Sequence, residues 1–245
     1  MPSFWLSDEY APGIYRFSND GHLLQSIPLP DSVLPRDAAG NLNFTSIIDP
    51  VAGRSANQGH QWLLWSSYLI DDFIGFEGLT IDSATGTLYA MLQSATIQDG
   101  GADKTTSRYT RLFAFDIKVL PPRLVGEWVV PLPLSNKNHT EACSEIQFVK
   151  EGVFFALSRD GDGRGGGDNK SSYKNADLFS IHGATDIHGK KFDNHLNPIA
   201  VNGTLDPSIK PAEYVAFISF IDPIQLARFG LHNGMPFTFL DDGVI

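Results

Sequence analysis

The chain has 245 residues and a net charge of −10, with 42% hydrophobic and 11% aromatic side chains. This composition excludes a disordered protein, and the acidic balance without a basic stripe excludes a nucleic-acid-binding protein. No run of about 18 apolar residues is present, so no membrane span is expected. The single cysteine, Cys143, cannot form an internal disulfide, and we expect it to be a small buried residue at the start of a strand.

The first part of the chain predicts a β-meander followed by irregular sequence. Apolar and polar side chains alternate, and an Asp20-Gly21 turn supplies the positive φ that a tight hairpin needs. Three strands are expected there, over residues 4–7, 14–17 and 23–29. Prolines and glycines interrupt residues 30–72, where residues 61–65 predict either a strand or a short helix.

The middle of the chain predicts a complete four-stranded unit, with strands over residues 75–82, 87–92, 111–117 and 125–130. The next unit begins with apolar strands over residues 146–149 and 153–157, joined by a Glu151-Gly152 turn. Its second strand ends in Ser158-Arg159-Asp160, and an acidic, glycine-rich loop follows before a strand over residues 177–181.

The three units share one plan. Residues 4–9, 89–94 and 155–160 match one another, and after a variable loop so do residues 14–17, 112–115 and 178–181. Repeated four-stranded meanders predict an all-β, β-propeller-like fold; a β-sandwich is the alternative. We interpret residues 1–245 as a single domain that is incomplete at both ends, a fragment of a longer chain. One short helix is expected around residues 224–229, with Asp222 as N-cap and Gly230 as C-cap.

Equivalent strand ends of successive propeller units converge at one rim, which would gather several acidic side chains. They belong to Asp8, Glu9, Glu77, Glu145 and Asp160, with Arg159 among them. Glu77 and Glu145 are interpreted as corresponding positions of two units. Gathered carboxylates repel one another unless they are protonated or bind a cation. Calcium is therefore expected as a cofactor, because it prefers many oxygen ligands; its ligands would be Asp8, Glu9, Asp160 and Asp162. Alternatively, the two glutamates only cap strands or pair with arginines.

Other motifs exclude several kinds of site. The loop that begins at Asp160 fails as an EF-hand, because Arg164 and Ser171 occupy ligand positions. The sequence contains no G-x-S-x-G, Arg-His-Gly, H-E-x-x-H or C-x-x-C motif. Three histidines have no zinc-site spacing and are expected on the surface: His182, His188 and His195.

Four N-x-S/T sequons are present where about two would be expected by chance. Their asparagines are Asn43, Asn138, Asn169 and Asn202. The excess favours a glycosylated, extracellular parent protein. The first residues lack the charged and apolar regions of a signal peptide, which agrees with a fragment.

Several segments together resemble the phytase-like family, also described as "esterase-like activity of phytase". They are residues 7–17, the G-F-E-G-L run at 75–79 with 87–90, residues 157–160 and residues 183–187. The resemblance extends from Phe4 to the C-terminus. It implies a secreted, propeller-like protein longer than this chain, and hydrolysis of phosphate esters. It also implies that the acidic residues named above and Arg159 lie on the family's recurring acidic and basic positions.

The expected function is therefore a calcium-assisted phosphoric-ester hydrolase that uses water as nucleophile on a small anionic substrate such as phytate. Glu77 or Glu145 would be the general base, and Arg159 with Arg16 would hold phosphate oxygens. Two alternatives stay open: a non-catalytic extracellular binding module, and a metal-dependent lactonase or carboxylic-ester hydrolase. The missing nucleophile elbow argues against a serine-dependent reaction.

Overall fold

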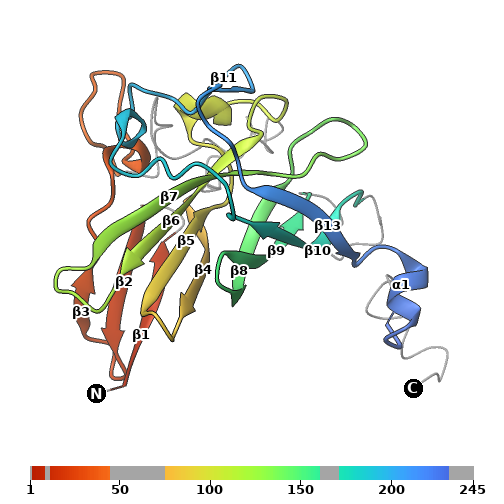
Figure 1. Ribbon diagram of the computed structural model, residues 1–245, viewed down its shortest axis with the longest axis horizontal. Coiled ribbons are helices and arrows are strands. Elements are labelled where there is room, and N and C mark those ends of the chain that lie inside the picture. Colours follow the sequence, from red (N-terminus) through yellow and green to blue (C-terminus); the bar gives the residue numbers. More distant parts are fainter. Residues whose placement is uncertain (1, 9–11, 45–74, 161–170, 232–245) are drawn as a thin grey trace, which may run out of the picture.

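The computed structural model describes residues 2–8, 12–44, 75–160 and 171–231, and this part of the chain is built mainly of antiparallel strands (Figure 1). A first sheet contains β1 (Ser3–Asp8), β2 (Gly13–Ser18) and β3 (Leu23–Ser26). The middle sheet contains β4 (Phe76–Asp82), β5 (Thr87–Leu92), β6 (Tyr109–Asp116) and β7 (Arg123–Pro131). The third contains β8 (Ala142–Lys150), β9 (Val153–Arg159), β10 (Lys174–Ser180) and β13 (Glu213–Ser219).

In all three sheets the spatial order of the strands follows their order in the chain, as a meander requires. The three sheets lie next to one another, with β1 against β4 and β4 against β8. The predicted all-β fold of repeated meanders is confirmed. Residues 61–65, for which a strand or helix was predicted, lie outside the described residues.

Two apolar layers hold the sheets together. Between the first and middle sheets pack Ile14, Phe76 and Phe113 with their neighbours. Between the middle and third sheets pack Met91, Ile146 and other buried side chains, including Cys143, as expected of this cysteine. Complete burial of side chains of this size stabilises a fold by roughly 1.5–3 kcal/mol each. The middle sheet is therefore covered on both faces.

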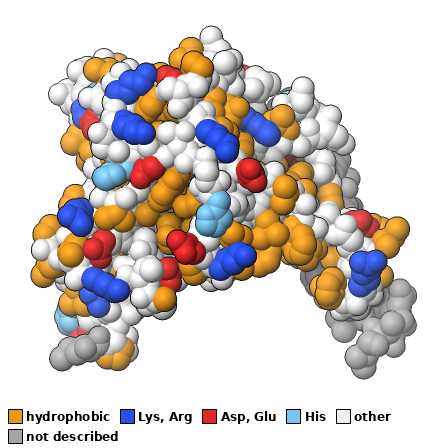
Figure 2. Space-filling model, viewed as in Figure 1, with side chains coloured by type: hydrophobic (Ala, Val, Ile, Leu, Met, Phe, Trp, Pro, Cys, Tyr) orange, Lys and Arg blue, Asp and Glu red, His pale blue; other side chains and the backbone are white. Residues whose placement is uncertain are grey.

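The outer face of the third sheet carries exposed apolar side chains. Leu157, Val215 and Phe217 are 43%, 57% and 54% exposed. Figure 2 shows hydrophobic side chains gathered on this side of the molecule, near β13 and the helix α1 (Pro223–Ala227).

The predicted helix is present as α1 with Asp222 as its N-cap, but it ends earlier than predicted and its C-cap is Arg228, not Gly230. The Asp222 carboxylate accepts hydrogen bonds from the backbone N–H groups of Ile224 and Gln225, Pro223 occupies the first turn, and Gly230 follows with φ +66°. No helix of the described residues is both long and apolar enough to cross a membrane.

The long connection from β10 to β13 is fastened by Arg111, whose side chain is completely buried. This connection contains the short helix η3 (Lys191–Asp193) and a hairpin of β11 (Ala200–Val201) and β12 (Thr204–Leu205). Arg111 forms a 2.7 Å ion pair with Asp99, in the helical turn η2 (Ile97–Gly101), and donates a 2.7 Å hydrogen bond to Glu127 on β7. It also donates to the carbonyl oxygen of Phe192 in η3. One buried cation thus joins three segments of the fold.

Candidate functional site

The predicted rim is one edge of the middle and third sheets. Phe76 at the start of β4 pairs with Leu92 at the end of β5, and Ala142 at the start of β8 pairs with Arg159 at the end of β9. Figure 1 shows β1 rising from the N-terminus toward the same side, which brings its last residue, Asp8, to this edge. Glu9 and Asp162 lie outside the described residues.

A β-bulge interrupts both inner strands at this edge. The register of β4 skips Glu77, between Phe76 and Gly78, and the register of β8 skips Ser144, between Cys143 and Glu145. Because Gly78 pairs with Met91 and Glu145 pairs with the equivalent Leu157, Glu77 corresponds to Ser144. The sequence-based correspondence between Glu77 and Glu145 is therefore wrong by one residue.

The bulges bring Glu77 and Arg159 together across two sheets. The Arg159 Nε donates a 2.7 Å hydrogen bond to the Ser144 hydroxyl, and its Nη2 lies 4.0 Å from the Glu77 carboxylate. The Arg159 side chain is 42% exposed and that of Glu77 is 17% exposed. The bulge serine thus orients a guanidinium that stays accessible to an anion beside a carboxylate that is largely shielded from solvent.

Glu145 is hydrogen-bonded to the backbone and does not contact Arg159 in the same way as Glu77. One carboxylate oxygen accepts hydrogen bonds from the backbone N–H of Leu79 on β4, at 2.9 Å, and of Ile146, at 2.8 Å. These bonds join the two inner strands, and they match the alternative that this glutamate caps a strand. Gly78 permits the close approach, since a Cβ there would lie 3.0 Å from the Ile146 side chain.

Asp160 directly follows β9 and is hydrogen-bonded to residues just before β10. Its carboxylate accepts hydrogen bonds from the Ser171 and Ser172 hydroxyls and from the backbone N–H of Tyr173. Burial raises the pKa of Asp160, but these hydrogen bonds, together with that from the Ser172 N–H, outweigh it and lower the pKa below its ordinary value. The ionised carboxylate is thus held by loop donors.

Two of the four expected calcium ligands, Glu9 and Asp162, lie outside the described residues. Among residues 2–8, 12–44, 75–160 and 171–231, no group of three or more His, Cys, Asp or Glu side chains could hold a metal ion. Asp160, another expected ligand, already accepts hydrogen bonds on both of its carboxylate oxygens.

Arg16 lies away from the rim. It pairs with Trp5 in the middle of the first sheet, its guanidinium lies over the Trp5 ring, and it donates to the Ser3 and Gln25 side chains. The structure therefore does not bring Arg16 to Glu77 and Arg159.

A buried network of hydrogen-bonded polar side chains lies beneath the rim and was not predicted from the sequence. Tyr173 and Tyr214 both donate 2.9 Å hydrogen bonds to the carboxylate of Asp177, which is fully buried. The Ser158 hydroxyl lies 2.6 Å from the Tyr214 hydroxyl. Burial raises the pKa of both phenols, and the Asp177 charge raises them further, so neither can act as a base. Ser158 is 2% exposed, so this network orders the sheet and offers no accessible nucleophile.

The sequence contains one indication of this network, a polar residue at an inward-facing position of a strand. Asp177 alternates with Phe179 on the buried face of β10. Polar residues at such positions require hydrogen-bond partners, but the sequence does not say which ones.

The predicted glycosylation sites lie on surface segments where the structure describes them. Asn138 and Asn202 are exposed and adopt positive φ in turns, and Asn43 is partly exposed. Asn169 lies outside the described residues. Among the histidines, His195 was expected on the surface, but its ring is 19% exposed and pairs with Asp31.

Comparison with known proteins agrees with the resemblance in the sequence. The family model described as "Phytase-like: Esterase-like activity of phytase" matches residues 2–212. An "Uncharacterized secreted protein" of Arthroderma benhamiae is 35% identical over 257 residues, covering 95% of this chain and 47% of that protein, so the chain spans about half the length of this relative. No solved structure matches. With most of its length matched, the chain belongs to the phytase-like family.

Proposed function

We propose that the protein is an extracellular phosphoric-ester hydrolase whose reaction takes place at Glu77 and Arg159. The observation that carries the proposal is the pairing of a shielded carboxylate with an accessible, oriented guanidinium at the bulges of two neighbouring sheets. A secreted relative and the family description support the compartment and the hydrolytic chemistry.

In this proposal each side chain has one role. Arg159 binds non-bridging oxygens of the phosphate, since a guanidinium matches their geometry and charge. Glu77 takes a proton from a water molecule, the water oxygen attacks phosphorus, and the P–O bond to the alcohol breaks. The alcohol leaves with a proton from solvent, and Glu77 later returns its proton to solvent. Glu145 is the weaker candidate for the base because two backbone donors already occupy one of its oxygens.

Calcium assistance stays a separate prediction, and no step above depends on it. Its expected ligands include Glu9 and Asp162, which lie outside the described residues. Phytate is the proposed substrate type. An acidic protein that hydrolyses such a polyanion needs local positive charge, from Arg159 or from a cation.

The test is phosphate release from phytate and from p-nitrophenyl phosphate by the purified protein, with calcium titrated against a chelator. Glu77→Gln should lower kcat about 100-fold or more, the usual loss for a general base. Arg159→Gln should raise KM and lower kcat, and Arg159→Lys should restore part of both. Glu151→Gln, at the exposed turn between β8 and β9, removes a carboxylate far from the rim and should leave the rate unchanged.

The outcomes separate the alternatives. Unchanged phosphate release in Glu77→Gln would refute the proposed base. Hydrolysis of p-nitrophenyl acetate without phosphate release would move the assignment to a carboxylic-ester hydrolase, which the words "esterase-like" in the family description favour. Binding of phytate without any product would indicate the binding module.

A further inference from the structure

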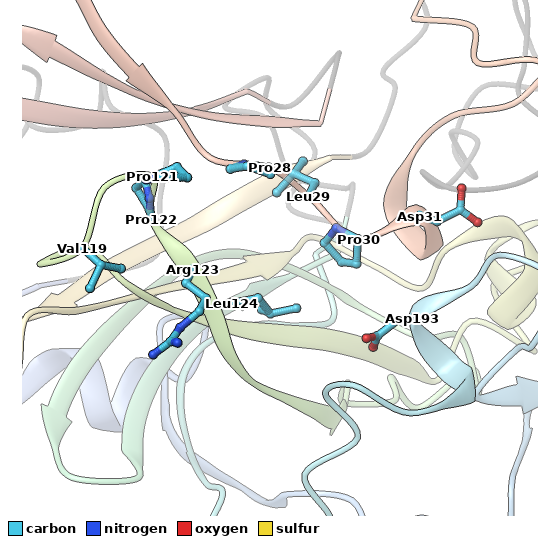
Figure 3. A pocket seen from close by; sticks show the side chains of 10 residues that line it. All are labelled: Pro28, Leu29, Pro30, Asp31, Val119, Pro121, Pro122, Arg123, Leu124 and Asp193. Carbon is cyan, nitrogen blue, oxygen red and sulfur yellow. The ribbon is translucent and has the colours of Figure 1, made fainter.

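A pocket of about 630 Å³ lies between segments that are distant in the sequence (Figure 3). Its walls are residues 28–31 after β3, Val119, Pro121 and Pro122 in the turn from β6 to β7, the first two residues of β7, and Asp193 in η3. Its size falls in the range of small-molecule sites. Because β7 and β4 are the two edges of the middle sheet, β7 is about 14 Å from the strand that carries Glu77.

Most of the wall is apolar and conformationally restricted. Its apolar side chains are Pro28, Leu29, Pro30, Val119, Pro121, Pro122 and Leu124. Proline offers no backbone N–H and has a fixed φ, so this wall presents few donors. A wall that is already ordered also loses little entropy when a ligand binds. The pocket therefore suits an apolar body.

The two carboxylates of the pocket are already engaged. Asp31 forms an ion pair with Arg36 and hydrogen bonds with the ring and the backbone N–H of His195. Burial raises the pKa of Asp31, but its hydrogen bonds outweigh this and lower the pKa to about 2, so the carboxylate is ionised and neutralised by its partners. Asp193 accepts from the Gly189 N–H, and its other oxygen faces the buried carboxyl of Glu127.

Arg123 supplies a positive charge that is not paired with any described residue. It is exposed, and its guanidinium has no hydrogen bond or ion pair with any residue that the structure describes. Figure 3 shows Arg123 with Val119 at one end of the pocket, and Asp31 and Asp193 at the other. An unpaired cation beside an apolar wall matches a ligand that carries a negative charge on an apolar body.

We propose that this pocket binds small amphiphilic carboxylates, molecules with an aliphatic or aromatic body and one carboxylate. The body lies against the prolines, Leu29 and Leu124, and the carboxylate pairs with Arg123. The site is independent of the proposed hydrolytic function, because none of its residues takes part at Glu77 and Arg159.

Calorimetric titration with decanoate, below its micellar concentration, tests the proposal. The wild type should bind decanoate, and decyltrimethylammonium, with the same chain and a positive charge, should bind more weakly. Arg123→Gln should weaken decanoate binding about fivefold, since a partly exposed ion pair contributes up to about 1 kcal/mol. Val119→Asn should weaken it as well. Val119 is 39% exposed, so the variant should keep its fold and melting temperature.

The matched control is Arg228→Gln, which removes an exposed arginine from the end of α1 and should not change the affinity. Three results would overturn the proposal. They are no binding of decanoate, equal affinity in the wild type and both pocket variants, and an equal loss in Arg228→Gln, which would indicate only net charge.

Discussion

The contact between the buried Glu127 and Asp193 gives a test of the electrostatics of this fold. Glu127 is 0% exposed, and one of its oxygens accepts a 2.7 Å hydrogen bond from Arg111. Its other oxygen and Oδ1 of Asp193 are both buried without a donor among the described residues. A proton on Glu127 satisfies both atoms at once, because the carboxylic acid can then donate to Asp193.

The pKa of Glu127 follows from these contacts. Burial raises it most, Arg111 lowers it in part, and the hydrogen bond to Asp193 raises it again, to about 8. The ordinary value is 4.5. Between pH 4.5 and 8 the native protein therefore binds more protons at this residue than the unfolded chain does. The stabilisation is complete below pH 4.5 and is lost as the pH rises through about 8.

Glu127→Gln should remove this dependence. The glutamine amide donates to Asp193 and its oxygen accepts from Arg111 at every pH, like the protonated acid. The contribution of Glu127 falls by up to about 1.4 kcal/mol per pH unit, so the free energy of unfolding of the wild type should fall by about 3–4 kcal/mol between pH 5 and pH 8 relative to that of the variant.

The assay is urea unfolding followed by tryptophan fluorescence at pH 5 to 9. Asp193→Asn should also flatten the profile, because its amide can donate to an ionised Glu127. Glu151→Gln removes an exposed carboxylate and should keep the wild-type slope. Parallel stability profiles for the wild type and Glu127→Gln would refute a shared proton.

Three further results are expected. Gly78→Ala should lower the free energy of unfolding by about 1–3 kcal/mol in urea titrations, since its Cβ would lie 3.0 Å from the Ile146 side chain and 3.3 Å from its backbone nitrogen; unchanged stability would mean that the two inner strands separate easily. Asp160→Asn should destabilise the protein at pH 7 by about 1–2 kcal/mol through weaker hydrogen bonds, and the difference should shrink as the pH falls below the ordinary value of 3.8 and through the lowered pKa of the native carboxylate; a constant difference would contradict the lowered pKa. Burial raises the pKa of the Cys143 thiol, so Ellman's reagent at pH 8 should label it only after unfolding, and rapid labelling of the native protein would contradict its burial.

The strands, the turns and the repeat follow from local patterns in the sequence. Alternation along a strand and the Gly152 turn are local properties, so residues 153–157 could be placed in β9 without knowledge of their neighbours. The strand ends that carry Asp8, Glu77 and Arg159 were predicted for the same reason. The repeat then brought these ends to one rim.

The pairing of side chains at that rim depends instead on how the sheets pack. A bulge moves Glu77 out of register without changing the apolar pattern, so the one-residue offset from Glu145 left no trace in the sequence. The bond from the Leu79 N–H to Glu145 spans 66 positions, and the one from the His195 N–H to Asp31 spans 164. Such pairs form where packed sheets and connections bring distant segments together. For that reason the charged residues of this protein could be identified from the sequence, but their hydrogen-bond partners depend on the packing of the sheets and connections.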